Sequence, residues 1–148
     1  MTITTAPRQS SAAARRFGYL VAAGVNGVLL YLINVAPGWQ ELTFLTSATV
    51  SVLTWVNTSL VAGIVANVLY VLDDAPAVRA FGDLVTTSIA LAAIVRVWQV
   101  FPFAFDQRGV HWEQVIRVLL VVATVGSAIA IVVQLVTLAR LAVKGARS

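Results

Sequence analysis

Residues 42–72, LTFLTSATVSVLTWVNTSLVAGIVANVLYVL, contain no charged side chain. Their apolar residues run continuously instead of alternating with polar ones, which favours helices over the strands of a membrane β-barrel. A helix needs about 20 apolar residues to cross roughly 30 Å of hydrocarbon. The stretch is too long for one untilted crossing. We therefore expect its polar beginning to lie at the interface and a membrane span to cover 50–72.

Three further spans follow from the same pattern. Residues 17–36 carry no charge and end in Ala36-Pro37-Gly38, and the run is longer than the apolar region of a cleaved signal peptide. Between the second and third spans, Asp74 can cap a helix and Pro76 suits a first turn. The prediction is an all-α membrane protein, a single domain built as a four-transmembrane-helix bundle, with spans over 17–36, 50–72, 81–101 and 113–139.

The composition agrees with a membrane protein. Apolar residues make up 59% of the chain and charged residues 11%, less than half of the roughly 25% in soluble domains. The net charge is +4, but the basic residues are scattered along the spans and their flanks instead of lining one face, which argues against nucleic-acid binding. Since the chain has no cysteine, disulfides, thiolate metal sites and thiol redox chemistry are excluded.

Basic residues near the span ends predict the orientation, because cytoplasmic loops are enriched in Lys and Arg. Only Arg108 lies in a loop on one side, whereas the other side carries Arg8, Arg15, Arg16, Arg79, Arg140, Lys144 and Arg147. Both termini are expected in the cytoplasm, as a flexible tail over 1–16 and a second tail over 140–148. Abundant Ala, Val and Arg beside one lysine suggest a GC-rich bacterial genome, and hence a bacterial plasma membrane.

Two arginines, Arg96 and Arg117, interrupt apolar sequence near the outer ends of the third and fourth spans. An arginine at the membrane centre costs roughly 2.5–3.5 kcal/mol on insertion scales, so each needs a partner or access to water. Glu113 precedes Arg117 by four residues, in the favourable order for a helical ion pair. Arg96 has no acid nearby on its own helix, where Gln99 shares its face.

Three explanations of Arg96 stay open. It can pair with an acid on the outer side (Glu41, Asp106 or Glu113), extend to lipid headgroups, or bind an anion such as a carboxylate or lipid phosphate. Tryptophans also gather in the outer half and are typical of an interfacial belt, although Trp55 lies deeper than the others. The hypothetical outward-facing ligand site comprises Arg96, Gln99, Trp98, Trp55, Arg117 and Glu113.

Other polar residues fall within the spans. Asp83 follows Arg79 by one turn, so a local salt bridge is expected, with a proton or cation site as the alternative. Membrane amides join helices through hydrogen bonds worth about 0.6–2 kcal/mol, or else line a polar pathway. The amides concerned are Asn26, Asn34, Asn57, Asn67 and Gln134.

Small residues recur at helical spacing in two spans and permit close approach of a second helix. The first span has Gly18, Ala22 and Asn26 at steps of four. The best candidate for a packing seam, within the chain or between identical subunits, is in the fourth span: Ala123, Gly126, Ser127 and Ala130.

No pattern for a cofactor or a catalytic site is present. The single histidine, His111, cannot supply paired haem ligands or a zinc site, and Lys144 lies past the last span. The sequence therefore favours a non-catalytic membrane module that self-associates or docks onto another membrane subunit. The alternative is a small oligomeric transporter, channel or lipid-binding protein with an anion or headgroup site around Arg96.

Overall fold

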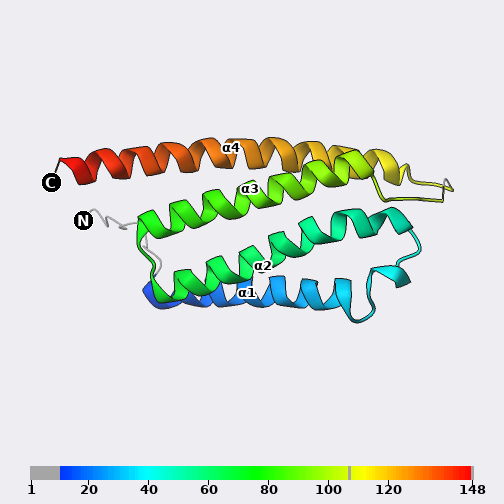
Figure 1. Cartoon of the computed structure of the whole chain (residues 1–148), viewed down its shortest axis with the longest axis horizontal. Helices are drawn as coiled ribbons and strands as arrows, with labels where there is room; N and C mark the ends of the chain where they lie inside the picture. Colours follow the sequence, from blue (N-terminus) through cyan, green and yellow to red (C-terminus); the bar gives the residue numbers. More distant parts are fainter. Residues whose placement is uncertain (1–10, 107, 148) are drawn as a thin grey trace, which may run out of the picture.

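The structure is a computed structural model that describes residues 11–106 and 108–147. It contains four long α-helices (Figure 1), which are α1 (Ala12–Asn34), α2 (Val50–Leu72), α3 (Pro76–Val100) and α4 (Trp112–Ala146). Two short 3₁₀ turns, η1 (Trp39–Glu41) and η2 (Ser47–Thr49), lie between α1 and α2. All four α-helices are long and apolar enough to cross a membrane. Among the described residues, the predicted number of helices long and apolar enough to span a membrane is confirmed.

Three of the helices extend beyond the predicted spans. The second helix covers 50–72 as predicted, but α1 already begins at Ala12, α3 begins at Pro76 and α4 continues to Ala146. Ser11 caps α1, because its hydroxyl accepts a hydrogen bond of 3.2 Å from the Ala14 amide. Parts of both predicted tails, residues 12–16 and 140–146, are therefore helical. Residues 1–10 of the N-terminal tail, including Arg8, lie outside the described residues.

The turn between α2 and α3 is built differently from the prediction. The side chain that forms a hydrogen bond within the turn is Asp73, not Asp74. The Asp73 carboxylate accepts a hydrogen bond of 3.0 Å from the Ala75 amide. Pro76 occupies the start of α3, as expected for a residue without a backbone N–H. The Asp74 side chain is thereby free to contact other helices instead of capping α3.

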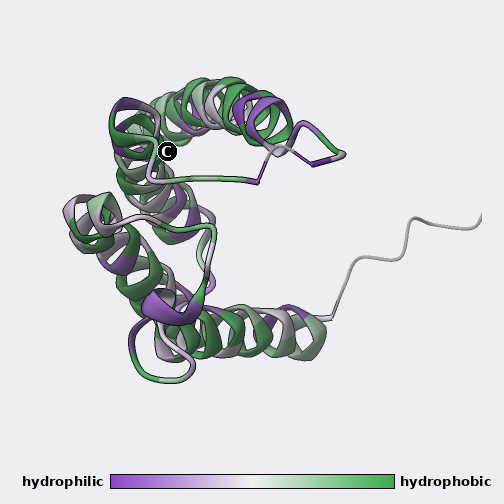
Figure 2. Cartoon of the chain, turned by 90° about the vertical axis from the view of Figure 1, so that its right-hand side faces the viewer, coloured by the Kyte–Doolittle hydropathy of each residue, from purple (hydrophilic) through white to green (hydrophobic). Residues whose placement is uncertain are grey.

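The four helices form an open row instead of a closed bundle. Each packs on its neighbour in chain order, α1 on α2, α2 on α3 and α3 on α4, and Figure 2 shows the row bent into an arc with α1 and α4 at its two edges. Figure 1 shows the start of α1, the turn 73–75 and the end of α4 at one end of the row. We call this the termini end, and the opposite end, with the longer connections, the loop end.

The central helices carry the buried core. Among described residues, the buried apolar side chains of the helices all lie in α2 and α3. They are Val52, Ala66, Tyr70, Ala80 and Ala93, of which three are alanines. Alanine side chains at buried positions permit close approach of neighbouring helices. Neither α1 nor α4 has a buried residue. This follows from the open row, because each edge helix packs on a single neighbouring helix.

At the loop end, the two long connections bind each other. The Thr46 amide donates to the Pro102 carbonyl at 2.8 Å, and the Ala104 amide donates to the Phe44 carbonyl at 2.9 Å. Leu45 and Phe103 form an antiparallel bridge, and Pro102 is fully buried beneath it. The connection before α2 is thus fixed to the connection after α3.

Candidate functional site

The ion pair expected within the fourth span is present at the loop end. Arg117 Nη2 and Nε lie 2.9 and 3.2 Å from Glu113 Oε1, one turn apart on α4. The Arg117 guanidinium also lies 4.3 Å from the ring centroid of Phe101 and 6.0 Å from that of Trp98, within the range of cation–π attraction. Phe101 ends α3 with φ 43°, a left-handed conformation that brings its ring to this position.

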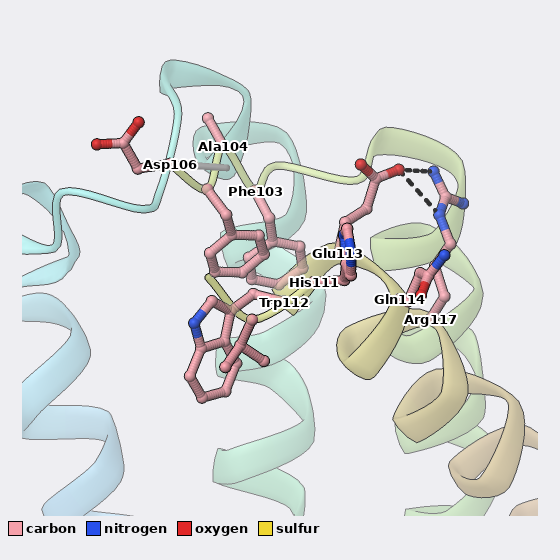
Figure 3. Close-up of a pocket in the computed structure, with 10 residues that line it drawn as sticks. Phe103, Ala104, Asp106, His111, Trp112, Glu113, Gln114 and Arg117 are labelled. Atoms are coloured by element: carbon pink, nitrogen blue, oxygen red, sulfur yellow. Dashed lines mark hydrogen bonds and ion pairs between the residues drawn. The ribbon is translucent and has the colours of Figure 1, made fainter. Parts of the chain in front are cut away.

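A pocket of about 510 Å³ opens beside this ion pair. Figure 3 shows it between the loop after α3 and the first turns of α4, with Glu113 and Arg117 joined at one side. The aromatic side chains of Phe103, Phe105 and Trp112 line it together with polar groups. Glu113 and Arg117 of the predicted ligand site also line it. The sequence analysis did not predict its aromatic wall, although three phenylalanines around Pro102 were a visible signal.

Arg96 lies in a different place from Arg117. Its Nη1 is 3.4 Å from Gln99 Oε1, the long hydrogen bond expected from residues that share a helix face. Within the described part of the chain, no carboxylate lies within 4 Å of Arg96. Of the three explanations left open for Arg96, pairing with Glu41, Asp106 or Glu113 is therefore not seen among the described residues. Glu113 is bound by Arg117 instead.

The predicted ligand-site residues are divided between two places. Trp55, Arg96 and Gln99 line one groove of about 650 Å³ between α2 and α3. Trp98 instead faces Arg117 and so belongs with the Glu113 ion pair. The prediction could not separate the two groups, because sequence spacing does not tell which residues of α3 face α2 and which face α4.

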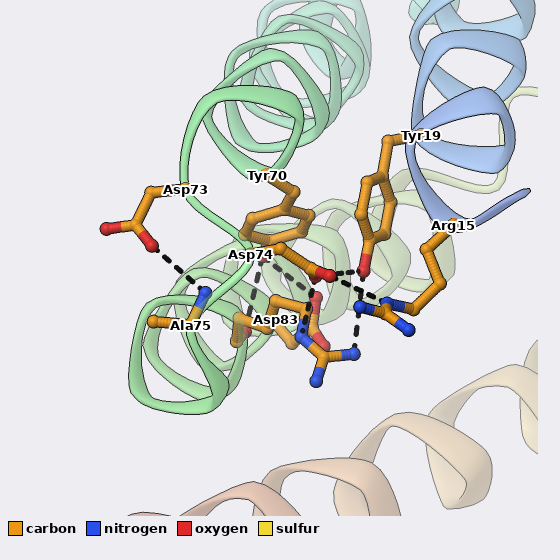
Figure 4. Close-up of polar contacts among 8 residues, drawn as sticks. Arg15, Tyr19, Tyr70, Asp73, Asp74, Ala75 and Asp83 are labelled. Carbon is orange, nitrogen blue, oxygen red and sulfur yellow. Dashed lines mark hydrogen bonds and ion pairs between the residues drawn. The ribbon is translucent and has the colours of Figure 1, made fainter. Parts of the chain in front are cut away.

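A second polar site lies at the termini end. Figure 4 shows side chains from α1, α2, α3 and the turn between α2 and α3 meeting there. We call it the termini-end cluster, and its members are Arg15, Tyr19, Tyr70, Asp74, Arg79 and Asp83. Its hydrogen bonds and ion pairs cross between helices, so the cluster ties three of the four helices together.

Asp74 is the centre of the termini-end cluster, and its side chain is 13% exposed. Its carboxylate accepts hydrogen bonds from Tyr19 Oη at 2.7 Å and from Arg15 Nε at 2.6 Å. Arg79 Nε lies 3.2 Å away, close enough for an ion pair but not aligned for a hydrogen bond. The Tyr19 hydrogen bond, followed by that of Arg15, lowers the pKa of Asp74 below its ordinary value.

The local salt bridge predicted between Arg79 and Asp83 is not formed. Arg79 pairs with Asp74, and Asp83 Oδ1 accepts a hydrogen bond of 2.9 Å from Tyr70 Oη. The Tyr70 ring stands edge-on to Tyr19, with centroids 5.4 Å apart. The prediction was wrong because it considered partners on one helix only, whereas the nearest donor to Asp83 comes from α2.

The membrane amides are hydrogen-bonded in separate places, some between two helices and some within one helix. Asn34 and Asn57 exchange two hydrogen bonds of 2.9 Å between α1 and α2, and Gln134 Nε2 lies 3.5 Å from Thr87 Oγ1 of α3. Asn26 and Asn67 donate to carbonyls one turn back on their own helices, those of Ala22 and Gly63. These contacts do not form a continuous polar path through the described residues.

The predicted seam of α4 has two sides. Ala123, Ser127 and Ala130 are half-buried on the same face as Gln134, which bonds Thr87 of α3, so this face packs within the chain. Gly126 instead is exposed, and a Cβ placed there would have nothing within 4 Å. Ala130 is therefore an intrachain packing residue, whereas Gly126 remains available to another molecule.

Neither a comparison with known proteins nor a search for metal ligands assigns a function to these sites. Across residues 11–106 and 108–147, no three His, Cys, Asp or Glu side chains gather where they could hold a metal ion. No family model, curated protein or solved structure matches this chain.

Proposed function

We propose that this chain is a non-catalytic membrane module that works by assembling with further copies of itself through the edge helices of its row. The observation that carries the proposal is the state of α1 and α4. Each packs on a single neighbour, and neither contributes a buried residue. The two edge helices thus retain faces for contacts with a second molecule in the plane of the membrane.

The glycines of the edge helices support protein contact over lipid contact. A glycine inside a helix costs roughly 0.5–1 kcal/mol relative to alanine, so it needs a compensating use. In the central helices this use is internal, because a Cβ at Gly63 would lie 2.9 Å from the Asn26 amide. A Cβ would meet nothing within 4 Å at any of the edge-helix positions Gly18, Gly24, Gly27 and Gly126. In membrane helices such residues permit close approach of a partner helix.

A transport pathway is less well supported than assembly. The polar side chains that would line it are bound in separate places, such as Asn57 on Asn34 and Asp83 on Tyr70. A pathway between subunits would need these contacts to open. Binding of a lipid or anion at Arg96 is compatible with the assembly function and does not require a pore.

The proposal includes the orientation of the module. We place the termini end in the cytoplasm and the loop end outside, in a bacterial plasma membrane. The support is the positive-inside rule, because Arg108 is the one basic residue in the loop-end connections while the termini end carries six in its described part, namely Arg15, Arg16, Arg79, Arg140, Lys144 and Arg147.

Disulfide cross-linking in membranes tests self-association. The chain has no cysteine, so Gly126→Cys and Leu135→Cys each introduce one thiol on α4, and both positions are exposed. They lie roughly 180° apart around the helix. Oxidation should join two copies of Gly126→Cys and leave Leu135→Cys monomeric. Absence of cross-linked dimer at Gly126, or equal yields at both positions, would contradict an interface through the Gly126 side of α4.

A further inference from the structure

Arg96 differs from the other two half-buried arginines of the helices, Arg15 and Arg79, each of which lies within 3.2 Å of a carboxylate. The exposed Arg117 also has a carboxylate partner, at 2.9 Å. Arg96 has a neutral partner instead, the Gln99 amide oxygen at 3.4 Å, and the described residues place no carboxylate within 4 Å of it. The guanidinium stays ionised in all protein environments, so its positive charge calls for an anion from outside the chain.

The position of Arg96 suits a group at the membrane interface. It precedes Val100, the last residue of α3, by four positions, or about 6 Å along the helix axis. A long arginine side chain covers that distance while its aliphatic stem stays among apolar groups. The guanidinium is therefore within reach of the end of α3, where we place the lipid phosphates.

A groove leads inward from Arg96. It has a volume of about 650 Å³ and lies between Trp55 of α2 and one face of α3 from Ser88 to Gln99. Eleven residue steps on α3 correspond to roughly 16 Å of length. Its walls beyond Arg96 are apolar or small, including Leu91, Ala92 and Val95. The Ser88 hydroxyl does not add a free donor to them, because it donates to the Leu84 carbonyl.

We propose that Arg96 binds a phosphate group, and that this phosphate belongs to a phospholipid whose acyl chain lies in the groove. A guanidinium holds phosphate through two parallel hydrogen bonds, which a lysine cannot do. Gln99 presents its oxygen to Arg96, which leaves its amide N–H groups to donate to the same phosphate. Trp55 is 44% exposed at the groove, where an indole can bind at once to lipid chains and to a polar headgroup. The site does not depend on self-association.

Lipid binding to the full chain in detergent, followed by native mass spectrometry, tests this site. The probes are phosphatidylglycerol, phosphatidylcholine and inorganic phosphate, added separately at equal concentrations. We expect phosphatidylglycerol to bind most tightly, and Arg96→Leu to weaken it about tenfold or more. Arg96→Lys keeps the positive charge and serves as a second variant in case Arg96→Leu does not fold. It should weaken binding less than Arg96→Leu does. Arg117→Gln is the matched control, because Arg117 already has a carboxylate partner, and it should leave binding unchanged.

The outcomes separate the possible occupants. Preference for phosphatidylglycerol that is lost in Arg96→Leu supports the lipid site, whereas inorganic phosphate binding at Arg96 without a lipid preference supports a phosphate site for a free anion and overturns the lipid part. Equal lipid binding by the wild-type protein and the folded Arg96→Leu variant overturns the proposal. Equal losses in Arg96→Leu and Arg117→Gln also overturn it, because they would indicate general attraction of anionic lipid to basic protein.

Discussion

Gly82 of α3 provides the space that the Tyr70 side chain of α2 occupies. A Cβ at position 82 would lie 2.8 Å from two carbon atoms of the Tyr70 ring and still closer to its hydroxyl. The ring cannot easily move away, because Tyr70 is 5% exposed and its hydroxyl donates to Asp83. One glycine thus permits the contact by which α2 reaches the termini-end cluster.

Gly82→Ala should therefore destabilise the protein, although alanine is the better helix former. We expect a loss of about 1–3 kcal/mol from overpacking, measured by unfolding in mixed detergent micelles. Gly126→Ala is the control in the dissociated monomer, because a Cβ there meets no neighbour within the chain, and it should be neutral or stabilise the monomer by up to about 1 kcal/mol. If both variants behaved alike, the close approach of Tyr70 to Gly82 would be wrong.

The hydroxyl of Tyr70 should contribute to the stability of the folded protein separately from its ring. Tyr70→Phe keeps the ring but removes the donor to Asp83, and a hydrogen bond to a charged group contributes roughly 1.5–3 kcal/mol. In the Gly82→Ala background the same change should cost less, since it also removes the atom closest to the new Cβ. Additive effects of the two substitutions in thermal unfolding would contradict this coupling.

The contribution of Asp74 to the stability of the folded protein should depend on pH and be lost in acid. Its pKa is lower in the folded protein than in the unfolded chain because Tyr19 and Arg15 bond the carboxylate form. The contribution is complete above the ordinary Asp pKa of about 3.9 and is lost as the pH falls through the lowered folded pKa. Asp74→Asn should reduce the melting temperature near pH 7 and differ less from the wild-type protein as the pH approaches 2.

The control for the pH dependence of Asp74→Asn is Asp73→Asn. Asp73 is exposed and bonds the Ala75 amide within its own turn, so its substitution should lower the melting temperature less than that of Asp74 at neutral pH. A larger effect at Asp73, or a difference between Asp74→Asn and the wild-type protein that grows toward acid, would show that the termini-end cluster does not stabilise the fold as described.

The amide pair between Asn34 and Asn57 should couple α1 to α2. The two side chains exchange two hydrogen bonds of 2.9 Å, and interhelical hydrogen bonds in membranes contribute about 0.6–2 kcal/mol. A double-mutant cycle with Asn34→Ala and Asn57→Ala should give a coupling energy in this range. Asn67→Ala with Asn34→Ala is the control cycle and should give none, since Asn67 bonds its own helix.

Sequence reasoning predicted what a single helix determines. The uncharged run before Asp73 located α2 to the residue, and the four-residue spacing of Glu113 and Arg117 predicted their ion pair. Both follow from length, hydropathy and helical periodicity, which need no knowledge of neighbouring helices. The continuation of α4 to Ala146 was missed because charged residues end an apolar run without ending a helix.

Contacts between helices were beyond the same reasoning. Membrane helices are apolar on all sides, so hydropathy does not show which face of α3 meets α2 and which meets α4. Asp83 was therefore assigned to Arg79 instead of Tyr70, and Arg96 was grouped with Trp98 instead of only with Trp55 and Gln99. The open row was missed for the same reason, since helix number and length fit a closed bundle equally well.

The most direct test of self-association is to count the chains in one assembly. Copies carrying a C-terminal fluorescent protein can be extracted with surrounding lipid into polymer discs and counted by single-molecule photobleaching. Self-association through the Gly126 side of α4 predicts two or more bleaching steps for the wild-type chain and one for Gly126→Leu, with Leu135→Ala unchanged as the control. A single step for the wild-type chain at low and high expression would contradict the account.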